Sequence, residues 1–149
     1  MKDINGIEIK VGDIVAVTDS YFKGHNGLYF VDKIEGTPGW SGGISLIKIS
    51  KKGAISTAKY NSQSWPLFIS CSDYFKARDA REYNKTNAKI AVVDNVDKGE
   101  IVAYFDNELA KTIEQKQHYE VMYGASHSSV TMLADMIKDY QKTIDRLVA

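Results

Sequence analysis

Residues 11–31, VGDIVAVTDSYFKGHNGLYFV, decide the fold expected for this chain. Residues 14–18 are mostly β-branched, which favours a strand. Residues 19–27 are polar and aromatic and contain two glycines, as is typical of an exposed loop. Residues 28–34 alternate imperfectly between two faces and predict a second strand. The stretch is therefore expected to form a strand, a loop and a strand.

Further strand signals continue on both sides of this stretch. Asn5-Gly6 and Gly12-Asp13 are turn signals near the N-terminus. Additional strands are expected at residues 44–50, 54–60, 65–69 and 90–93, with a hairpin turn at residues 51–53. Pro66 lacks an amide donor, so its segment is expected at the edge of a sheet or at the entry to a strand. Five or six short antiparallel strands are typical of a small barrel or sandwich.

The remainder of the chain has the periodicity of helices. Ser72 is a suitable N-cap for a short helix over residues 73–85. A longer helix is expected from residue 100 to 123, ended by Gly124. Its apolar stripe at i,i+4 spacing comprises Ile101, Phe105, Leu109 and Ile113. Ser128 or Ser129 is expected to cap the last helix.

The last helix carries an apolar seam with alternating spacings of three and four residues. A short linker before it predicts an antiparallel helical hairpin over residues 100–148. The seam can pack on the partner helix, on the barrel or on a second copy, and its short length favours packing within the chain. The alternative is a homodimer through Val130, Leu133, Ile137, Tyr140 and Ile144. The expected fold is α+β, a small barrel over residues 1–93 followed by this hairpin.

Composition narrows the class of protein. The chain has 149 residues, which is about one domain, and a formal net charge of zero. Its single cysteine, Cys71, cannot form an internal disulfide, which fits a reducing compartment. The N-terminal sequence has no signal-peptide pattern, and no apolar run approaches the length of a membrane span. We therefore expect a soluble cytoplasmic protein that does not enter a membrane.

The charges are unevenly distributed along the chain. Residues 36–72 contain four lysines and no acidic residue, whereas residues 94–149 contain six basic and ten acidic residues. A basic middle and an acidic tail fit either ordinary solvated surfaces or a basic face that meets an anion. Arginine is absent before Arg78, which weighs against sequence-specific reading of bases.

Known catalytic and metal-binding patterns are missing from the sequence. His25, His118 and His127 are too far apart for metal-ligand spacing. No His/Asn signature accompanies Cys71, and no serine elbow or phosphate loop occurs. We therefore expect no catalytic residue, no metal and no cofactor.

Two resemblances refine these expectations. Residues 12–17 and 23–27, followed by Val31, resemble the KOW motif. KOW modules are SH3-like barrels of ribosomal proteins and transcription elongation factors, so the resemblance implies that fold and RNA or DNA binding. The loop differs from the family in being aromatic rather than basic at Tyr21 and Phe22, which favours a packed protein partner.

A second resemblance covers more of the chain. The chain is similar to uncharacterised proteins carried by bacterial mobile elements at residues 55–60, 65–67 and 72–73, at Lys76, at residues 83–84, and at Ala88, Ile90 and Val92. That resemblance implies an accessory role on a phage, a plasmid or a conjugative element.

Aromatic and basic side chains on the loops of the first domain form the expected partner-binding surface, since aromatic residues anchor protein contacts or stack on bases. We expect a non-enzymatic binding module that engages a host protein or ribonucleoprotein, for example an anti-CRISPR type inhibitor of a defence nuclease. The alternatives are a KOW-type RNA- or DNA-binding protein and an enzyme with an unrecognised site. The expected binding residues are Tyr21, Phe22, Lys23, His25, Asn26, Trp40, Lys51, Lys52, Lys59 and Tyr60.

Overall fold

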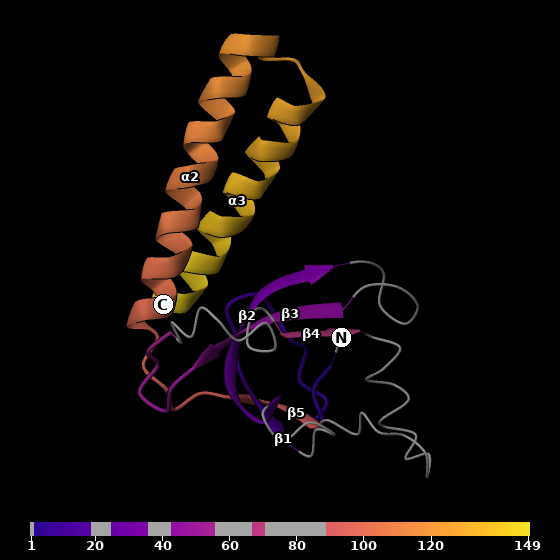
Figure 1. The fold of residues 1–149 in the computed structure, drawn as a ribbon, viewed down its shortest axis with the longest axis vertical. Coiled ribbons are helices and arrows are strands. Elements are labelled where there is room, and N and C mark those ends of the chain that lie inside the picture. The colour runs from indigo at the N-terminus through magenta and orange to yellow at the C-terminus, as the bar shows by residue number, and fades with distance from the viewer. Residues whose placement is uncertain (1, 19–24, 36–42, 56–66, 71–88) are drawn as a thin grey trace. The chain divides into compact units, whose positions relative to one another are not determined.

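The computed structural model describes residues 2–18, 25–35, 43–55, 67–70 and 89–149 (Figure 1). Within these residues the fold is α+β, with strands first and two long helices last, and the chain divides into compact units Met1–Asp97 and Lys98–Ala149. The short helix expected at 73–85 and most of the strand expected at 54–60 lie outside the described residues. The elements are β1 (Ile14–Thr18), β2 (Gly27–Glu35), β3 (Gly43–Ile49), β4 (Leu67–Ser70), β5 (Lys89–Val93), α2 (Gly99–Tyr123) and α3 (Ser128–Val148).

The described strands form one antiparallel sheet in the order β4-β3-β2-β1-β5. Strands β1 to β4 follow one another as a meander, and β5 returns to pair with β1, with Ala16 opposite Ala91. The edge position of β4 agrees with the prediction for the segment that contains Pro66. In the described part of the chain β4 and β5 are not paired with each other, so the sheet is open there.

The core of this unit lies on both faces of the sheet. Strand β3 is buried at five consecutive positions, Gly43 to Ile47, and β2 at Tyr29, Phe30 and Val31. Such runs are expected for strands that are covered on both sides. One cluster of buried side chains joins β1, β2, β3 and β5 to the N-terminal segment and contains Ile9, Val15, Val17, Tyr29, Val31, Ile44, Leu46 and Ile90.

A β-bulge explains why the pattern in β2 alternates imperfectly. The pairing with β3 runs regularly from Leu28 to Val31 and then shifts before Lys33. A bulge inserts one residue into one strand and so exchanges the faces beyond it. The strand was predicted correctly, and its irregular pattern follows from this shift.

Asp3 fastens the N-terminal turn to β5. Its buried carboxylate accepts hydrogen bonds from the amides of Asn5 (2.9 Å), Ile7 (2.8 Å) and Val92 (2.8 Å). Three amide donors satisfy the carboxylate oxygens in place of water, which makes burial of the acid tolerable. The predicted turn at Asn5-Gly6 therefore has a tertiary anchor that lies 89 residues away in sequence.

The helices α2 and α3 lie side by side and antiparallel (Figure 1). Gly124 ends α2 as predicted, with φ of 87°. The predicted cap of α3 was wrong: His127 is the N-cap, and its Nδ1 accepts a hydrogen bond from the amide of Ser129 at 3.2 Å. An imidazole nitrogen thus performs the task that Ser, Thr, Asp or Asn usually performs.

The apolar seam of α3 is used within the hairpin. Val130 and Leu133 are buried, Ile137 and Ile144 are half-buried, and the ring of Tyr140 lies 6.2 Å from that of Phe105 on α2. Packing within the chain was the favoured alternative, and α2 provides it. The homodimer stays a prediction.

The stripe predicted for α2 is correct only at its beginning. Ile101 and Phe105 are fully buried, but Ile113 is 37% exposed, and Thr112 is buried at 4% instead. Four residues turn a helix by about 400°, so a strict i,i+4 row drifts about 40° around the axis per step. A helix that keeps one face towards its partner alternates between steps of four and three.

Candidate binding surfaces

Four of the ten predicted binding residues fall within the described residues: His25, Asn26, Lys51 and Lys52. The other six lie outside them, namely Tyr21, Phe22, Lys23, Trp40, Lys59 and Tyr60. Their part in binding stays a prediction.

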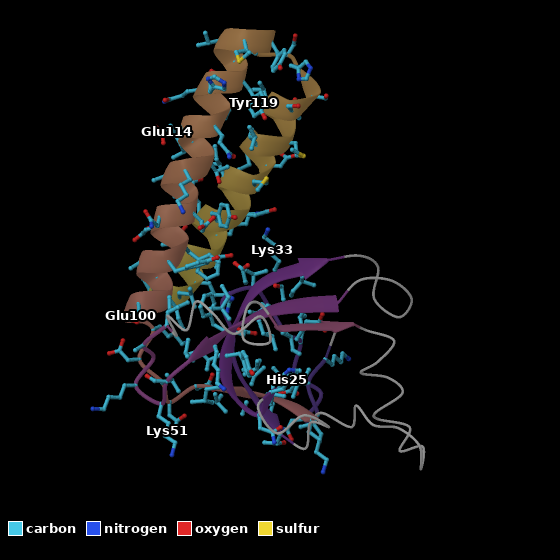
Figure 2. All side chains as sticks on the ribbon, in the orientation of Figure 1. His25, Lys33, Lys51, Glu100, Glu114 and Tyr119 are labelled. Carbon is cyan, nitrogen blue, oxygen red and sulfur yellow. The ribbon has the colours of Figure 1, made fainter. Side chains whose placement is uncertain are left out.

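The four described residues lie just beyond the same end of two neighbouring strands, β2 and β3. His25 and Asn26 directly precede β2, and Lys51 and Lys52 follow β3, whose Ile49 pairs with Leu28. The two lysines are exposed, whereas His25 and Asn26 are half-buried. Figure 2 shows His25 and Lys51 well apart, so the two pairs do not form one compact site.

The backbone carbonyl of His25 is held by a hydrogen bond from a core side chain. The hydroxyl of Tyr29 donates a hydrogen bond of 2.8 Å to the carbonyl oxygen of His25. Tyr29 is buried in the core, and this burial raises the pKa of its phenol above the ordinary value. The hydrogen bond fixes the chain at the entry to β2.

The turn at residues 51–53, which we call the lysine turn, is hydrogen-bonded at its base. The hydroxyl of Ser50 accepts hydrogen bonds from the amides of Lys52 (3.3 Å) and Ala54 (3.1 Å). Gly53 closes the turn with φ of 85°, and its backbone packs against that of Asp97. Two exposed ammonium groups on a fixed turn can attract phosphate or carboxylate groups.

A column of aromatic rings stands near the linker of the helical hairpin. The ring of Tyr123 stacks on those of Tyr119 (5.7 Å, 22°) and His127 (4.9 Å, 27°), and His118 meets Tyr119 edge-on at 5.9 Å. We call these four residues the aromatic column. It was not selected from the sequence, although Tyr119, Tyr123 and His127 recur at intervals of four residues.

Beside the column lies an exposed apolar surface that was also missed. Residues 121–134, which we call the hairpin end, contain no Asp, Glu, Lys or Arg. Four of its large apolar side chains are more than half exposed: Val121 (86%), Met122 (57%), Tyr123 (53%) and Met132 (57%). Exposed large apolar side chains that gather on one part of a protein are typical of interaction sites.

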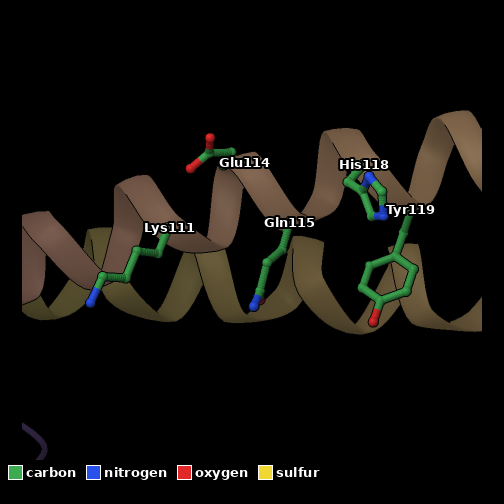
Figure 3. Close-up of a pocket in the computed structure, with 5 residues that line it drawn as sticks. All are labelled: Lys111, Glu114, Gln115, His118 and Tyr119. Atoms are coloured by element: carbon green, nitrogen blue, oxygen red, sulfur yellow. The ribbon is translucent and has the colours of Figure 1, made fainter.

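An open groove of about 530 Å³ runs along α2, lined by Lys111, Glu114, Gln115, His118 and Tyr119. Figure 3 shows Lys111, Gln115 and Tyr119 projecting in one direction from successive turns of the helix. The side chains that line this groove can donate and accept hydrogen bonds. The described residues contain no group of three or more His, Cys, Asp or Glu side chains that could hold a metal ion.

Neither α2 nor α3, the helices that the structure describes, is long and apolar enough to cross a membrane. Comparisons with protein-family models, with curated proteins and with solved structures gave no match. Function has to be inferred from the chain's own surfaces.

Proposed function

We propose that this protein is a non-enzymatic binding module of a phage, plasmid or conjugative element that engages a host protein or ribonucleoprotein. Inhibition of a defence nuclease, as by an anti-CRISPR protein, is the specific activity we put forward. The observation that carries the proposal is the exposed, uncharged apolar surface of the hairpin end, because exposed Met and Tyr side chains are typical of protein interfaces. The origin in a mobile element rests on the resemblance described above.

We further propose that the strands of residues 1–93 form an SH3-like barrel of the KOW type. Two features support it: β5 returns beside β1, and β2 and β3 are buried on both faces. A closed sheet would protect the backbone amides at its edges. Slow amide hydrogen exchange in both β4 and β5 would support closure, and rapid exchange in either strand would contradict it.

The test of function uses an RNA-guided nuclease of the host, purified with its guide RNA. The full-length protein is added in increasing molar ratio before target DNA, and DNA cleavage and complex formation are measured together. We expect DNA cleavage to fall in proportion to the protein added. We also expect the protein and the nuclease to elute together in size-exclusion chromatography. Full cleavage and separate elution at tenfold molar excess, across the nuclease types of the host, would rule out nuclease inhibition.

The host-partner proposal is tested separately by affinity capture from host lysate, with and without prior nuclease digestion. A partner retained after digestion binds through protein, whereas a partner lost after digestion is bridged by RNA or DNA.

A second candidate function, binding of RNA or DNA, is favoured by the exposed pair Lys51 and Lys52 on their hydrogen-bonded turn. Binding through phosphates is electrostatic and must weaken as salt rises. Absence of RNA and DNA binding at low salt would exclude this function.

A further inference from the structure

We propose that the hairpin end, residues 121–134, is the surface by which the protein docks into an uncharged, apolar groove on its partner protein. The inference rests on the proposed function and names the surface that performs it. Three features of the hairpin end support the inference: its lack of charged residues, its exposed apolar side chains and the contacts that hold it.

The composition of the hairpin end indicates the chemistry of its partner. Charged residues make up 26% of the chain, so a stretch of this length would carry about three or four of them, yet charges stop at Glu120 and resume at Asp135. Charged side chains are depleted at the centres of protein interfaces because they lose hydration there. The stretch has no Lys or Arg to neutralise phosphate, and the partner surface is therefore apolar rather than anionic.

The exposed side chains are of the types that anchor protein contacts. Val121 and Met122 leave α2 in its last turn and Met132 leaves the first turns of α3, while Val130 and Leu133 are buried. The exposed apolar groups are thus in excess of those the hairpin needs for its own packing. Methionine adapts its shape to a partner, and tyrosine supplies a large contact with few rotatable bonds.

The hairpin end is held in place before any partner arrives. Tyr123 is stacked between Tyr119 and His127, and His127 also caps α3. One turn earlier, Lys116 Nζ and Glu120 Oε1 form an ion pair of 2.6 Å. Groups that such contacts already hold in the free protein lose less conformational entropy on association.

The test places the photoreactive amino acid p-benzoylphenylalanine at residue 122, at residue 132 or, as a control, at residue 141 of the full-length chain. Gln141 is exposed on α3 outside the hairpin end. After illumination of host cells we expect one protein to be crosslinked from residues 122 and 132 and not from residue 141. Crosslinking to a second copy of this chain, to lipid or to nothing would overturn the inference.

The captured protein is then purified and its affinity measured, since capture alone does not count as support. Met122→Glu is expected to weaken binding at least tenfold, and the matched change Gln141→Glu less than twofold. Both positions are exposed, and circular dichroism verifies that both variants remain helical. Equal affinities of the two variants would also overturn the inference.

A probe at residue 51 on the lysine turn separates this inference from the proposed function. A partner captured from residue 51 and unaffected by Met122→Glu would leave the proposed function intact and remove the hairpin end from it. Failure to capture a protein from any of the probed positions would contradict both.

Discussion

At the scale of single residues, Gly53 and Gly6 have nearly the same backbone conformation and opposite surroundings. Their φ values are 85° and 81°, but a Cβ atom on Gly53 would collide with the carbonyl oxygen of Asp97, whereas one on Gly6 meets nothing within 4 Å. We expect Gly6→Ala to cost only backbone strain, about 1–2 kcal/mol. Gly53→Ala adds a collision with main chain and should cost more than about 3 kcal/mol.

Urea unfolding of the two glycine variants measures this difference. Because the strain is common to both, the excess cost of Gly53→Ala reports the close approach to Asp97. Equal losses of stability would show that the lysine turn is not clamped there.

Tyr29 should make stability sensitive to alkaline pH. Burial raises the pKa of Tyr29 in the folded protein above the ordinary value, so the unfolded chain releases this proton first as pH rises. The resulting stabilisation is complete below about pH 10 and is lost as pH rises through the folded pKa. Tyr29→Phe should cost about 1 kcal/mol at neutral pH, because the carbonyl of His25 loses its donor.

Urea unfolding of both proteins at a series of pH values tests this titration. The difference in stability should shrink as pH rises above about 10, since the variant lacks the titrating phenol. The other tyrosines titrate in both proteins and cancel. A difference that is constant with pH would contradict the effect of burial on Tyr29.

At the scale of elements, the start of α3 depends on an unusual cap. His127→Ala removes the acceptor for the amide of Ser129 and should destabilise the helix start by about 0.5–1 kcal/mol. His127→Asn restores an acceptor but not the ring that stacks on Tyr123. We expect amide hydrogen exchange at Ser129 to accelerate in the alanine variant and to return to the wild-type rate in the asparagine variant. Fast exchange in both would assign the effect to stacking.

The same elements show what local pattern can predict. Strand β1 was predicted to the residue, because a β-branched run between a Gly-Asp turn and a polar loop leaves few alternatives. The bulge in β2 and the exposure of Ile113 were not predicted, because each depends on how a neighbouring element pairs or packs. The cap at His127 was missed because Ser128 and Ser129 match the usual preference.

At the scale of the whole molecule, the seam of α3 bears on oligomeric state. Because Val130 and Leu133 are already buried, we expect a monomer of 16.6 kDa in sedimentation equilibrium. A dimer through the seam would have twice this mass and would return to monomer mass on Ile137→Lys. A dimeric wild type with that response would contradict the expectation.

The proposed binding surface at the hairpin end was harder to find in the sequence than the strands and helices. Aromatic and basic residues on the loops of the sheet attract attention in a sequence because loops are exposed. Val121, Met122 and Met132 lie within helices, where apolar residues usually form the buried stripe. Only the packing of α2 on α3 decides that these three face solvent. The absence of charge from 121 to 134 was the signal available in the sequence.

The response of partner binding to salt should distinguish the two surfaces in the intact protein. Docking through the hairpin end involves no ion pair of Asp, Glu, Lys or Arg within residues 121–134, so the dissociation constant should change less than about twofold between 50 and 200 mM salt. Binding through Lys51 and Lys52 to two phosphates would weaken roughly tenfold over the same range. Lys51→Gln with Lys52→Gln would then remove the dependence on salt. A steep dependence that this double variant abolishes would assign partner recognition to the lysine turn instead of the hairpin end.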